Sequence, residues 1–568
     1  MSRLVQLRAL LERPLLRDAA PDGAAEVLIR FAMALIVGLT FMLVVYAGLR
    51  AAGVAARGLA AWLGLAVALA IVLRVTGAAT FRATVALLAT VAVALLLCWL
   101  VVDTQFDSQR YHAAGVEALL RGWNPYADPP IEGPTSTWTN HYPKGTWMMA
   151  AAVIEATGRY ETGKAVNLIL AVAAWSACAA WLLQLGFIRT AAFALATLLI
   201  ANPIITTQMF SLYVDGVLAT AVMAFLACTT LALGGGGAGP ALATAACLAL
   251  LLPSFKFTGV FFAGAVLGAA ALIALNNGRG RQVAPQIALL ALALLLGTVV
   301  LAFNPYVANW IVAGHPLHPV LGAAAMPILA VQEMPEMQRW PLPIRVLLSV
   351  ASRSTQASWG PIPLKPPFLV FPREVATLWM PDLRLGGFGP WFSGGVVLAV
   401  IAAGRLWGTH VSRQARLLLL LAAGLTLMCC VVPGGWWARL VPVLWAAPVL
   451  AAAAVLHSPQ PRIRGHALAW ASLAALAANA AAIGAASGAA GVVRTFIVSA
   501  QTQKLESQRS PLRVEFGRSI AYRVRFAERA LAVVEIPGDT CAGGRHMSFS
   551  DTWVCSDSPA PREAKPPP

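Results

Sequence analysis

The sequence predicts an all-α polytopic membrane protein with about 13 transmembrane helices, periplasmic loops and a small β-rich module at its C-terminal end. Of the 568 residues, 59% are hydrophobic and 11% are charged, whereas soluble domains carry about 25% charged residues. Apolar runs at 27–49, 84–102 and 285–303 are each long enough to cross a hydrocarbon core of about 30 Å as a helix. These runs lack the alternation of barrel strands, and backbone groups in lipid must be hydrogen-bonded within the protein. These observations together indicate membrane-spanning helices.

Apolar segments follow one another along the whole chain, and the pattern allows eleven to fourteen spans. The thirteen that we assign lie near residues 27–49, 59–73, 84–102, 164–186, 190–206, 215–233, 239–252, 257–275, 285–303, 391–404, 415–432, 440–456 and 466–490. No small-residue cleavage site follows the first run, so we expect a retained anchor. We divide the chain into a cytoplasmic N-terminal segment at 1–26, a transmembrane domain at 27–493 and a periplasmic tail module at 494–568.

The arginines set the expected orientation. With the N-terminus inside, the inner loops and the N-terminal segment hold most loop arginines: Arg3, Arg8, Arg13, Arg17, Arg74, Arg82, Arg189, Arg279, Arg281, Arg405, Arg413, Arg416, Arg462 and Arg464. The short outer loops carry Arg50, Arg57, Lys256 and Arg439. This bias predicts a bacterial inner-membrane protein with loops 103–163 and 304–390 on the periplasmic side. The net charge of +17 therefore reports topology, and we expect no nucleic-acid partner.

Two of the outer regions have their own pattern. Loop 304–390 contains 14 prolines, which precludes long regular helices. In the tail, Leu512, Val514 and Phe516 alternate with polar residues, and residues 520–526 repeat the alternation. We interpret both runs as strands of a small β-rich module.

The eight cysteines fall into two classes. Six lie in apolar segments, where cysteine acts as a small hydrophobe: Cys98, Cys178, Cys228, Cys247, Cys429 and Cys430. Cys541 and Cys555 lie in the polar tail, and in a periplasmic tail we expect them to form a disulfide.

The longest polar interruption in the first half of the chain, at 101–147, is the strongest candidate for a site. Asp103 and Asp107 directly follow an apolar span. A partly desolvated carboxylate there can act as a general base, although a lone acid can also simply end a helix in the headgroup region. Asp107 lies four residues before Tyr111, which His112 follows.

The order of these residues resembles the first periplasmic loop of the GT-C glycosyltransferase superfamily. These polytopic enzymes take sugars from polyprenyl-phosphate carriers. In the aminoarabinose transferase and protein O-mannosyltransferase branches, the loop reads roughly Asp-Glu-x-x-Tyr, followed by a lysine-proline motif. Asp107 and Tyr111 match, Lys144 stands in a Tyr-Pro-Lys-Gly turn, and Ser108 replaces the second acid. Because of Ser108, a metal site based on paired acids does not carry over directly, and a divalent metal is left open as a cofactor.

The resemblance continues downstream and covers roughly residues 27–456. Asn202 and Pro203, followed by the run 210–216 that ends in Asp215 and a glycine, look like the second acidic motif of these enzymes. Residues 254–259 around Lys256 resemble a lysine-glycine motif, and 304–316 a recurrent periplasmic segment. Residues 436–442 around Arg439 are similar to the late aromatic-arginine-proline motif.

The resemblance implies a glycosyltransferase that works at the periplasmic face by an inverting direct displacement. The expected catalytic residues are Asp107 and Asp215, and the expected substrate-binding residues are Tyr111, His112, Lys144, Lys256 and Arg439. One carboxylate would accept the proton of the acceptor while the cations stabilise the departing phosphate. The expected partners are a polyprenyl-phosphate-linked sugar, a lipid, glycan or protein acceptor, and membrane lipids.

Other interpretations of the same residues remain open. Lys256 and Arg439 could be snorkelling anchors, Lys144 a solvated turn residue, and His112 a loop-positioning residue. A transporter or lipid-linked-sugar flippase is the main alternative, but transporters place polar residues near the membrane midplane and often have two similar halves. A scaffold whose tail recruits a periplasmic partner is a third hypothesis.

Overall fold

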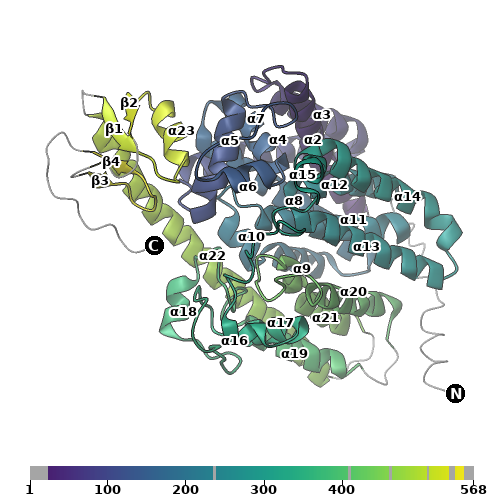
Figure 1. The fold of residues 1–568 in the computed structure, drawn as a ribbon. Coiled ribbons are helices and arrows are strands. Elements are labelled where there is room, and N and C mark those ends of the chain that lie inside the picture. Colours follow the sequence, from purple (N-terminus) through teal and green to yellow (C-terminus); the bar gives the residue numbers. More distant parts are fainter. Residues whose placement is uncertain are drawn as a thin grey trace.

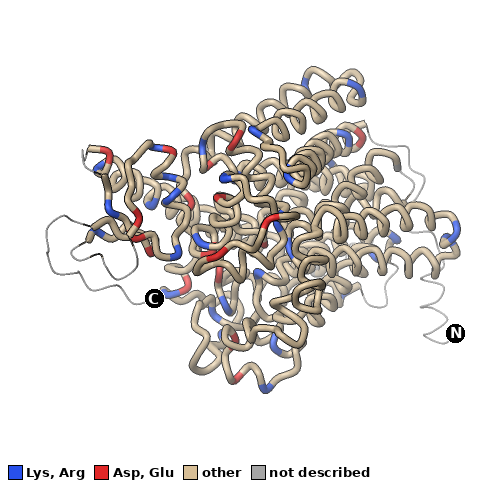
Figure 2. The backbone as a smooth tube through the Cα atoms, turned by 45° about the horizontal axis from the view of Figure 1, so that its top comes forward, with Lys and Arg blue, Asp and Glu red and all other residues tan. Residues whose placement is uncertain are grey.

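The computed structural model describes residues 23–234, 238–406, 411–458, 463–507, 511–536, 541 and 544–555. A large helical body is joined to a small C-terminal module with a sheet (Figure 1). Most of the N-terminal segment 1–26 and part of the glycine-rich loop 234–237 lie outside the described residues. Charged residues are sparse along most of the helical body and are more frequent in the C-terminal module, on the left of Figure 2.

Each of the thirteen apolar segments overlaps a helix. These helices are α2 (Gly23–Ala51), α3 (Leu59–Val75), α4 (Thr80–Leu100), α8 (Ala165–Gln184), α9 (Arg189–Ile200), α11 (Asp215–Gly234), α12 (Ala238–Phe255), α13 (Phe257–Asn276), α14 (Gly280–Leu296), α19 (Phe392–Gly404), α20 (Arg413–Cys429), α21 (Ala446–Leu456) and α22 (Ile463–Glu506). Within the described ranges, seven helical stretches are long and apolar enough to cross a membrane, and five further apolar helices are shorter. The length and apolar composition of these helices indicate a membrane protein, and the count of thirteen spans stays a prediction.

Helix α11 lies at the centre of the helical body. It contacts α8, α12 and α13 as well as the short helix α10 (Pro203–Gln208). Of its most apolar window, 89% is buried inside the protein, the highest share among the candidate spans. The first residue of this enclosed helix is Asp215. The fold therefore places one predicted acid at the end of its best-packed element.

Helices α2 and α3 approach each other at a pair of glycines. A Cβ added to Gly64 would lie 2.7 Å from the carbonyl oxygen of Gly38, and one added to Gly38 would lie 2.8 Å from that of Gly64. Small residues permit such close backbone contact between membrane helices.

We expect Gly64→Ala to destabilise the protein by about 1–3 kcal/mol, because the added methyl forces the two backbones apart. Thermal unfolding in detergent measures the effect. Gly48→Ala on the same helix pair is the matched control, since nothing lies within 4 Å of a Cβ there, and helix propensity alone favours alanine. Equal melting temperatures for the two variants would contradict the close packing.

Regions 103–163 and 304–390, which the structure describes throughout, contain only short helices. Region 103–163 holds the π-type turn Ser108–His112, α5 (Ala113–Leu120), α6 (Ser136–His141), α7 (Gly145–Thr157) and the 3₁₀ turn Tyr160–Lys164. Region 304–390, with its many prolines, holds most of α15 (Phe303–Ala313), α16 (Pro335–Gln338), α17 (Leu342–Val350) and α18 (Pro372–Thr377). No described helix within 304–390 is long, as the prolines predict.

The C-terminal module is a small mixed sheet with one helix. Its strands are β1 (Leu512–Glu515), β2 (Val533–Glu535), β3 (Arg545–His546) and β4 (Trp553–Val554), in the order β2-β1-β4-β3. β1 pairs in parallel with β2 and antiparallel with β4. The 44-residue helix α22 runs from the helical body into this module (Figure 1), where Val498 and Leu505 join its apolar core.

The second predicted strand of the tail is wrong. Residues 520–526 form most of helix α23 (Ala521–Glu528) instead. Tyr522 and Phe526 are four residues apart, which suits one face of a helix as well as one face of a strand. Both are buried in the module core, where the Phe526 ring lies 6.0 Å from that of Phe516. Packing against the module core therefore favours a helix over a strand at these residues.

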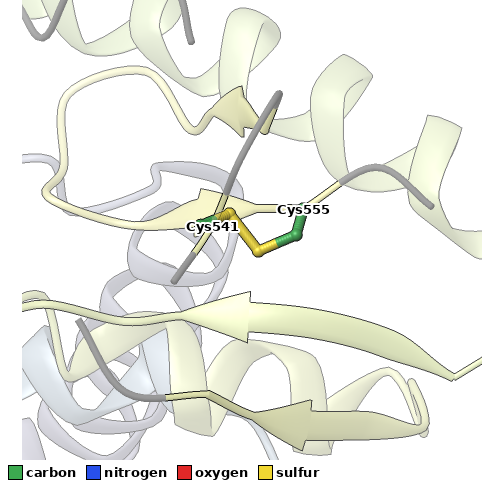
Figure 3. Close-up of a disulfide and its surroundings, with 2 residues drawn as sticks. All are labelled: Cys541 and Cys555. Atoms are coloured by element: carbon green, nitrogen blue, oxygen red, sulfur yellow. A yellow bond between two sulfur atoms is a disulfide. The ribbon is translucent and has the colours of Figure 1, made fainter. Parts of the chain in front are cut away.

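The two tail cysteines form a disulfide. Cys541 and Cys555 are joined with their Cα atoms 5.3 Å apart, at the end of β4 (Figure 3). The other six cysteines are free, and four of them are fully buried among apolar side chains.

Candidate functional site

The segment that carries Asp107 is bent. It leaves α4 after Leu100 and enters the π-type turn Ser108–His112, in which Arg110 has non-helical dihedral angles of φ −99° and ψ −106°. All five residues of this turn are buried. The bend turns neighbouring side chains toward different partners.

Asp103 is used to fix this segment in place. Its Oδ2 accepts hydrogen bonds from the backbone N of Leu212 at 3.0 Å and from Ser108 Oγ, and its Oδ1 accepts from Gln105 N at 3.0 Å. Ser108 Oγ also accepts from Leu212 N at 2.7 Å. Burial raises the pKa of the Asp103 carboxyl, which Lys164 counteracts. Ser108, in the place of a second acid, thus ties the segment to the loop before α11.

Three carboxylates from distant parts of the chain converge on Arg439. Its Nη1 lies 3.1 Å from Asp107 Oδ2 and 3.1 Å from Asp382 Oδ2, and its Nε lies 3.6 Å from Asp215 Oδ2. The Arg439 side chain is partly buried, with 14% of its surface exposed. Arginine suits such a position because its planar group offers five donors.

Two more cations complete this group. Lys256 pairs with Asp215 Oδ1, and Arg384 Nη1 lies 3.0 Å from Asp382 Oδ1. We call these three acids and three bases the ionic centre: Asp107, Asp215, Asp382, Lys256, Arg384 and Arg439. Its formal charges cancel, as expected for charges removed from water.

The environment changes the proton affinity of these groups. Burial raises the pKa of Asp107, against the effect of Arg439, and the neighbouring Asp382 and Asp215 raise it further. Burial lowers the pKa of Lys256, and the pair with Asp215 opposes that shift. For Arg439 burial also acts downward, but the carboxylates outweigh it and hold the pKa well above its ordinary value. Asp107 therefore has the raised pKa that suits a general base.

Aromatic side chains surround the ionic centre. Tyr111 donates a long hydrogen bond of 3.5 Å from its hydroxyl to Asp107 Oδ2, and the Tyr213 hydroxyl accepts from Asp107 N at 3.3 Å. The guanidinium of Arg439 lies 4.7 Å from the centroid of the Trp437 ring and 5.5 Å from that of Tyr213. These rings limit the number of directions from which water can reach the carboxylate.

His112 is buried beside this aromatic group and held in one tautomer. Its Nδ1 accepts a hydrogen bond of 2.8 Å from Trp147 Nε1, so Nε2 carries the proton. Nε2 has no hydrogen-bond partner within the described part of the chain. Burial lowers the pKa of His112 to about 3. The ring is therefore neutral at physiological pH.

This shift predicts that acid destabilises the fold through His112. The unfolded residue binds a proton near pH 6.5 and the folded one only near pH 3, so stability is lost as the pH falls below about 6.5. From pH 7 to pH 5 the loss from this group is about 2 kcal/mol. We expect His112→Gln to lose that much less than the wild type, measured by unfolding in detergent at both pH values. His315→Gln, in another loop, is the control, and equal acid sensitivity of wild type and His112→Gln would contradict the buried neutral ring.

Lys144 is buried and has no ion pair within the described ranges. Its Nζ donates to the carbonyl oxygens of Asn140 at 2.6 Å and Tyr142 at 2.7 Å, and it lies 5.8 Å from the Trp147 ring centroid. Burial lowers its pKa well below the ordinary value. Trp147 contacts both Lys144 and His112, so its ring connects these two predicted residues, and the contacts of Lys144 do not include a member of the ionic centre among the described residues.

The structure thus brings five predicted residues together. Asp107 and Asp215 both contact Arg439, Tyr111 contacts Asp107, and Lys256 contacts Asp215. Sequence reasoning missed five other members of the site: Gln208, Tyr213, Asp382, Arg384 and Trp437. Gln208 holds Asp215 by donating from Nε2 to Oδ2 at 3.1 Å. Trp437 donates from Nε1 to Asp382 Oδ1 at 3.0 Å. Tyr213 and Trp437 stand inside the motifs that pointed to Asp215 and Arg439, and that proximity was the available signal.

The side chains do not fit a divalent metal. Among the described residues, no three His, Cys, Asp or Glu side chains lie close enough to share one ion. The carboxylate oxygens that converge here are already bonded to Arg439, Lys256, Arg384 and Trp437. The guanidinium of Arg439 occupies the position where the three carboxylates meet.

Comparison of the chain with protein-family models, with curated proteins and with solved structures gives no match.

Proposed function

We propose that the protein is a membrane glycosyltransferase that moves a sugar from a polyprenyl-phosphate carrier to an acceptor at the outer, periplasmic face of the bacterial inner membrane. The observation that carries the proposal is the convergence of Asp107, Asp215 and Asp382 on the partly buried Arg439. Ionisable residues at the ends of membrane helices face a cavity or a partner, and they mark functional sites.

Asp107 is the general base of this proposal. The acceptor hydroxyl or amine attacks the anomeric carbon, its proton passes to Asp107, and the bond from that carbon to the phosphate oxygen breaks with both electrons going to the oxygen. One displacement of this kind inverts the anomeric centre. The raised pKa of Asp107 favours the proton transfer.

Arg439 couples the proton uptake by Asp107 to the departure of the phosphate through its charge. When Asp107 takes the proton, Arg439 loses one of its three anionic partners. At the same time the leaving phosphate gains one negative charge. The cation released from Asp107 is then available to stabilise the leaving group, together with Lys256. Asp215 keeps both cations in place through its contacts with Lys256 and Arg439.

Reconstitution in liposomes tests this function. The purified protein is supplied with short-chain polyprenyl-phosphate sugars and with lipid, glycan and peptide acceptors, and the release of polyprenyl phosphate is measured. We expect release that depends on the acceptor, and none when a nucleotide sugar replaces the lipid-linked donor. Movement of a donor or a sugar across the bilayer without transfer would favour the transporter or flippase instead.

A further inference from the structure

We propose that Arg525 and Asp551 of the C-terminal module are positioning residues that hold the segment 103–112 from behind, so that Asp107 meets Arg439. The inference rests on the proposed role of Asp107. It assigns the module a task in the reaction itself.

Arg525 connects the two sides of Asp107. Its Nη2 donates to the carbonyl oxygen of Asp103 at 2.5 Å, and its Nη1 donates to Gln109 Oε1 at 3.1 Å. Arg525 also pairs with Glu161 at 2.8 Å, and the other oxygen of Glu161 accepts from Asp103 N at 3.1 Å. One buried guanidinium from α23 therefore fixes the backbone four residues before Asp107 and the side chain two residues after it.

The turn before β4 holds the same segment at a second place. Arg110 Nη2 donates to both carboxylate oxygens of Asp551, at 2.7 and 3.0 Å. Gln109 Nε2 donates to the carbonyl oxygen of Phe549 at 2.6 Å. Arg110 is the residue whose backbone departs from helical geometry. The module thus forms hydrogen bonds with the segment at its bend.

The segment consequently has two faces with different partners. Asp107 and Tyr111 face the ionic centre, whereas Gln109 and Arg110 face the module. A shift of the bend moves Asp107 with it, because Arg110 is only three positions along the chain from Asp107. General-base catalysis requires the base within hydrogen-bond reach of the proton, so a small displacement reduces the rate.

The turn that carries Asp551 is bonded within the module. Met547 N donates to the carbonyl oxygen of Thr552 at 2.9 Å, and Asp551 N donates to Ser519 Oγ at 2.7 Å. The disulfide between Cys541 and Cys555 closes the chain around the β3–β4 pair on either side of this turn (Figure 3).

Two variants remove the same ion pair from opposite sides in the full-length reconstituted protein: Asp551→Asn and Arg110→Met. We expect kcat for sugar transfer to fall at least tenfold in each, with KM for the lipid-linked donor unchanged within twofold. The acidic limb of the pH–rate profile should move to lower pH, because water entering around Asp107 lowers its pKa toward the ordinary value. Asp551→Glu, which keeps the carboxylate, should recover part of the rate.

Hydrogen exchange of the amides at 103–112 gives a readout that does not depend on activity. We expect at least tenfold faster exchange in Asp551→Asn and Arg110→Met, and wild-type exchange in the control Glu506→Gln, whose carboxylate pairs with Arg529 away from the segment. Unchanged exchange in both test variants would contradict the inference that the module holds segment 103–112; we call this set of contacts the clamp. Faster exchange with an unchanged kcat and pH profile would overturn the positioning role. A wild-type protein without transferase activity would instead overturn the proposed function, and the exchange data would still decide on the clamp.

Discussion

Asp107→Asn is expected to lower kcat for sugar transfer by about 10²- to 10⁴-fold, the contribution of a general base, while the protein stays folded and inserted. Asparagine has nearly the same shape, and its oxygen can still accept the hydrogen bond that Arg439 donates to Asp107 Oδ2 at 3.1 Å. What disappears is the ability to take the acceptor's proton. The measurement is the rate of polyprenyl-phosphate release in liposomes at saturating donor and acceptor.

The matched control for this variant is Glu132→Gln, which removes one negative charge from an exposed position in the same region, 103–163. It should retain wild-type kcat. The wild type should also lose activity in acid at a pH above 3.8, since burial raises the pKa of Asp107 from that value. Wild-type turnover by Asp107→Asn would remove the basis of the assigned mechanism.

Arg439→Met is expected to abolish transfer and to cost about 3–5 kcal/mol of unfolding free energy, because removal of one partner leaves buried charges uncompensated. Asp107, Asp215 and Asp382 all lose their shared cation in this variant. Chemical or thermal unfolding in detergent measures the loss. Arg439→Lys should also fail in transfer, because a single ammonium group cannot reproduce the planar fork.

Two companion variants separate charge from general damage. Adding Asp107→Asn to Arg439→Met should return part of the stability without returning activity. Among the described residues Asp107 has no other cation, whereas Asp215 keeps Lys256 and Asp382 keeps Arg384. Arg121→Met, whose side chain is 67% exposed, should change stability by no more than about 0.5 kcal/mol. An unchanged melting temperature for Arg439→Met would show that the carboxylates do not depend on this cation.

The sequence was informative where charge stands at the end of an apolar segment. Asp107, Asp215, Lys256 and Arg439 each lie next to a predicted span, and the predicted orientation puts those ends on one side of the membrane. The Asp107–Tyr111 spacing was a second local signal, and the two side chains contact each other. Helix positions were predictable for a related reason, since long apolar runs have few alternatives in lipid.

The sequence was not informative about contacts made by an irregular chain. Asp382 and Arg384 lie in a long proline-rich loop with many other charges, and nothing local shows that this part returns to Arg439. Asp103 and Asp107 look alike in the sequence, but the first binds backbone and the second binds Arg439. In the tail, the alternation at 520–526 was compatible with two periods, and only packing against Phe516 decides between them.

The contact between Arg110 and Asp551 spans 441 residues of sequence. At a synthesis rate of about 5–20 residues per second, roughly 20–90 s separate the translation of the two partners. During that interval the Asp107 segment has already left the ribosome but lacks the part of the protein that holds it. Synthesis would therefore first deliver a chain in which the Asp107 segment is not yet held, and the contact would form only after the last-made module has docked. On the proposed positioning role, a truncation late in the gene would lower activity even though it leaves Asp107, Asp215 and Arg439 in the chain.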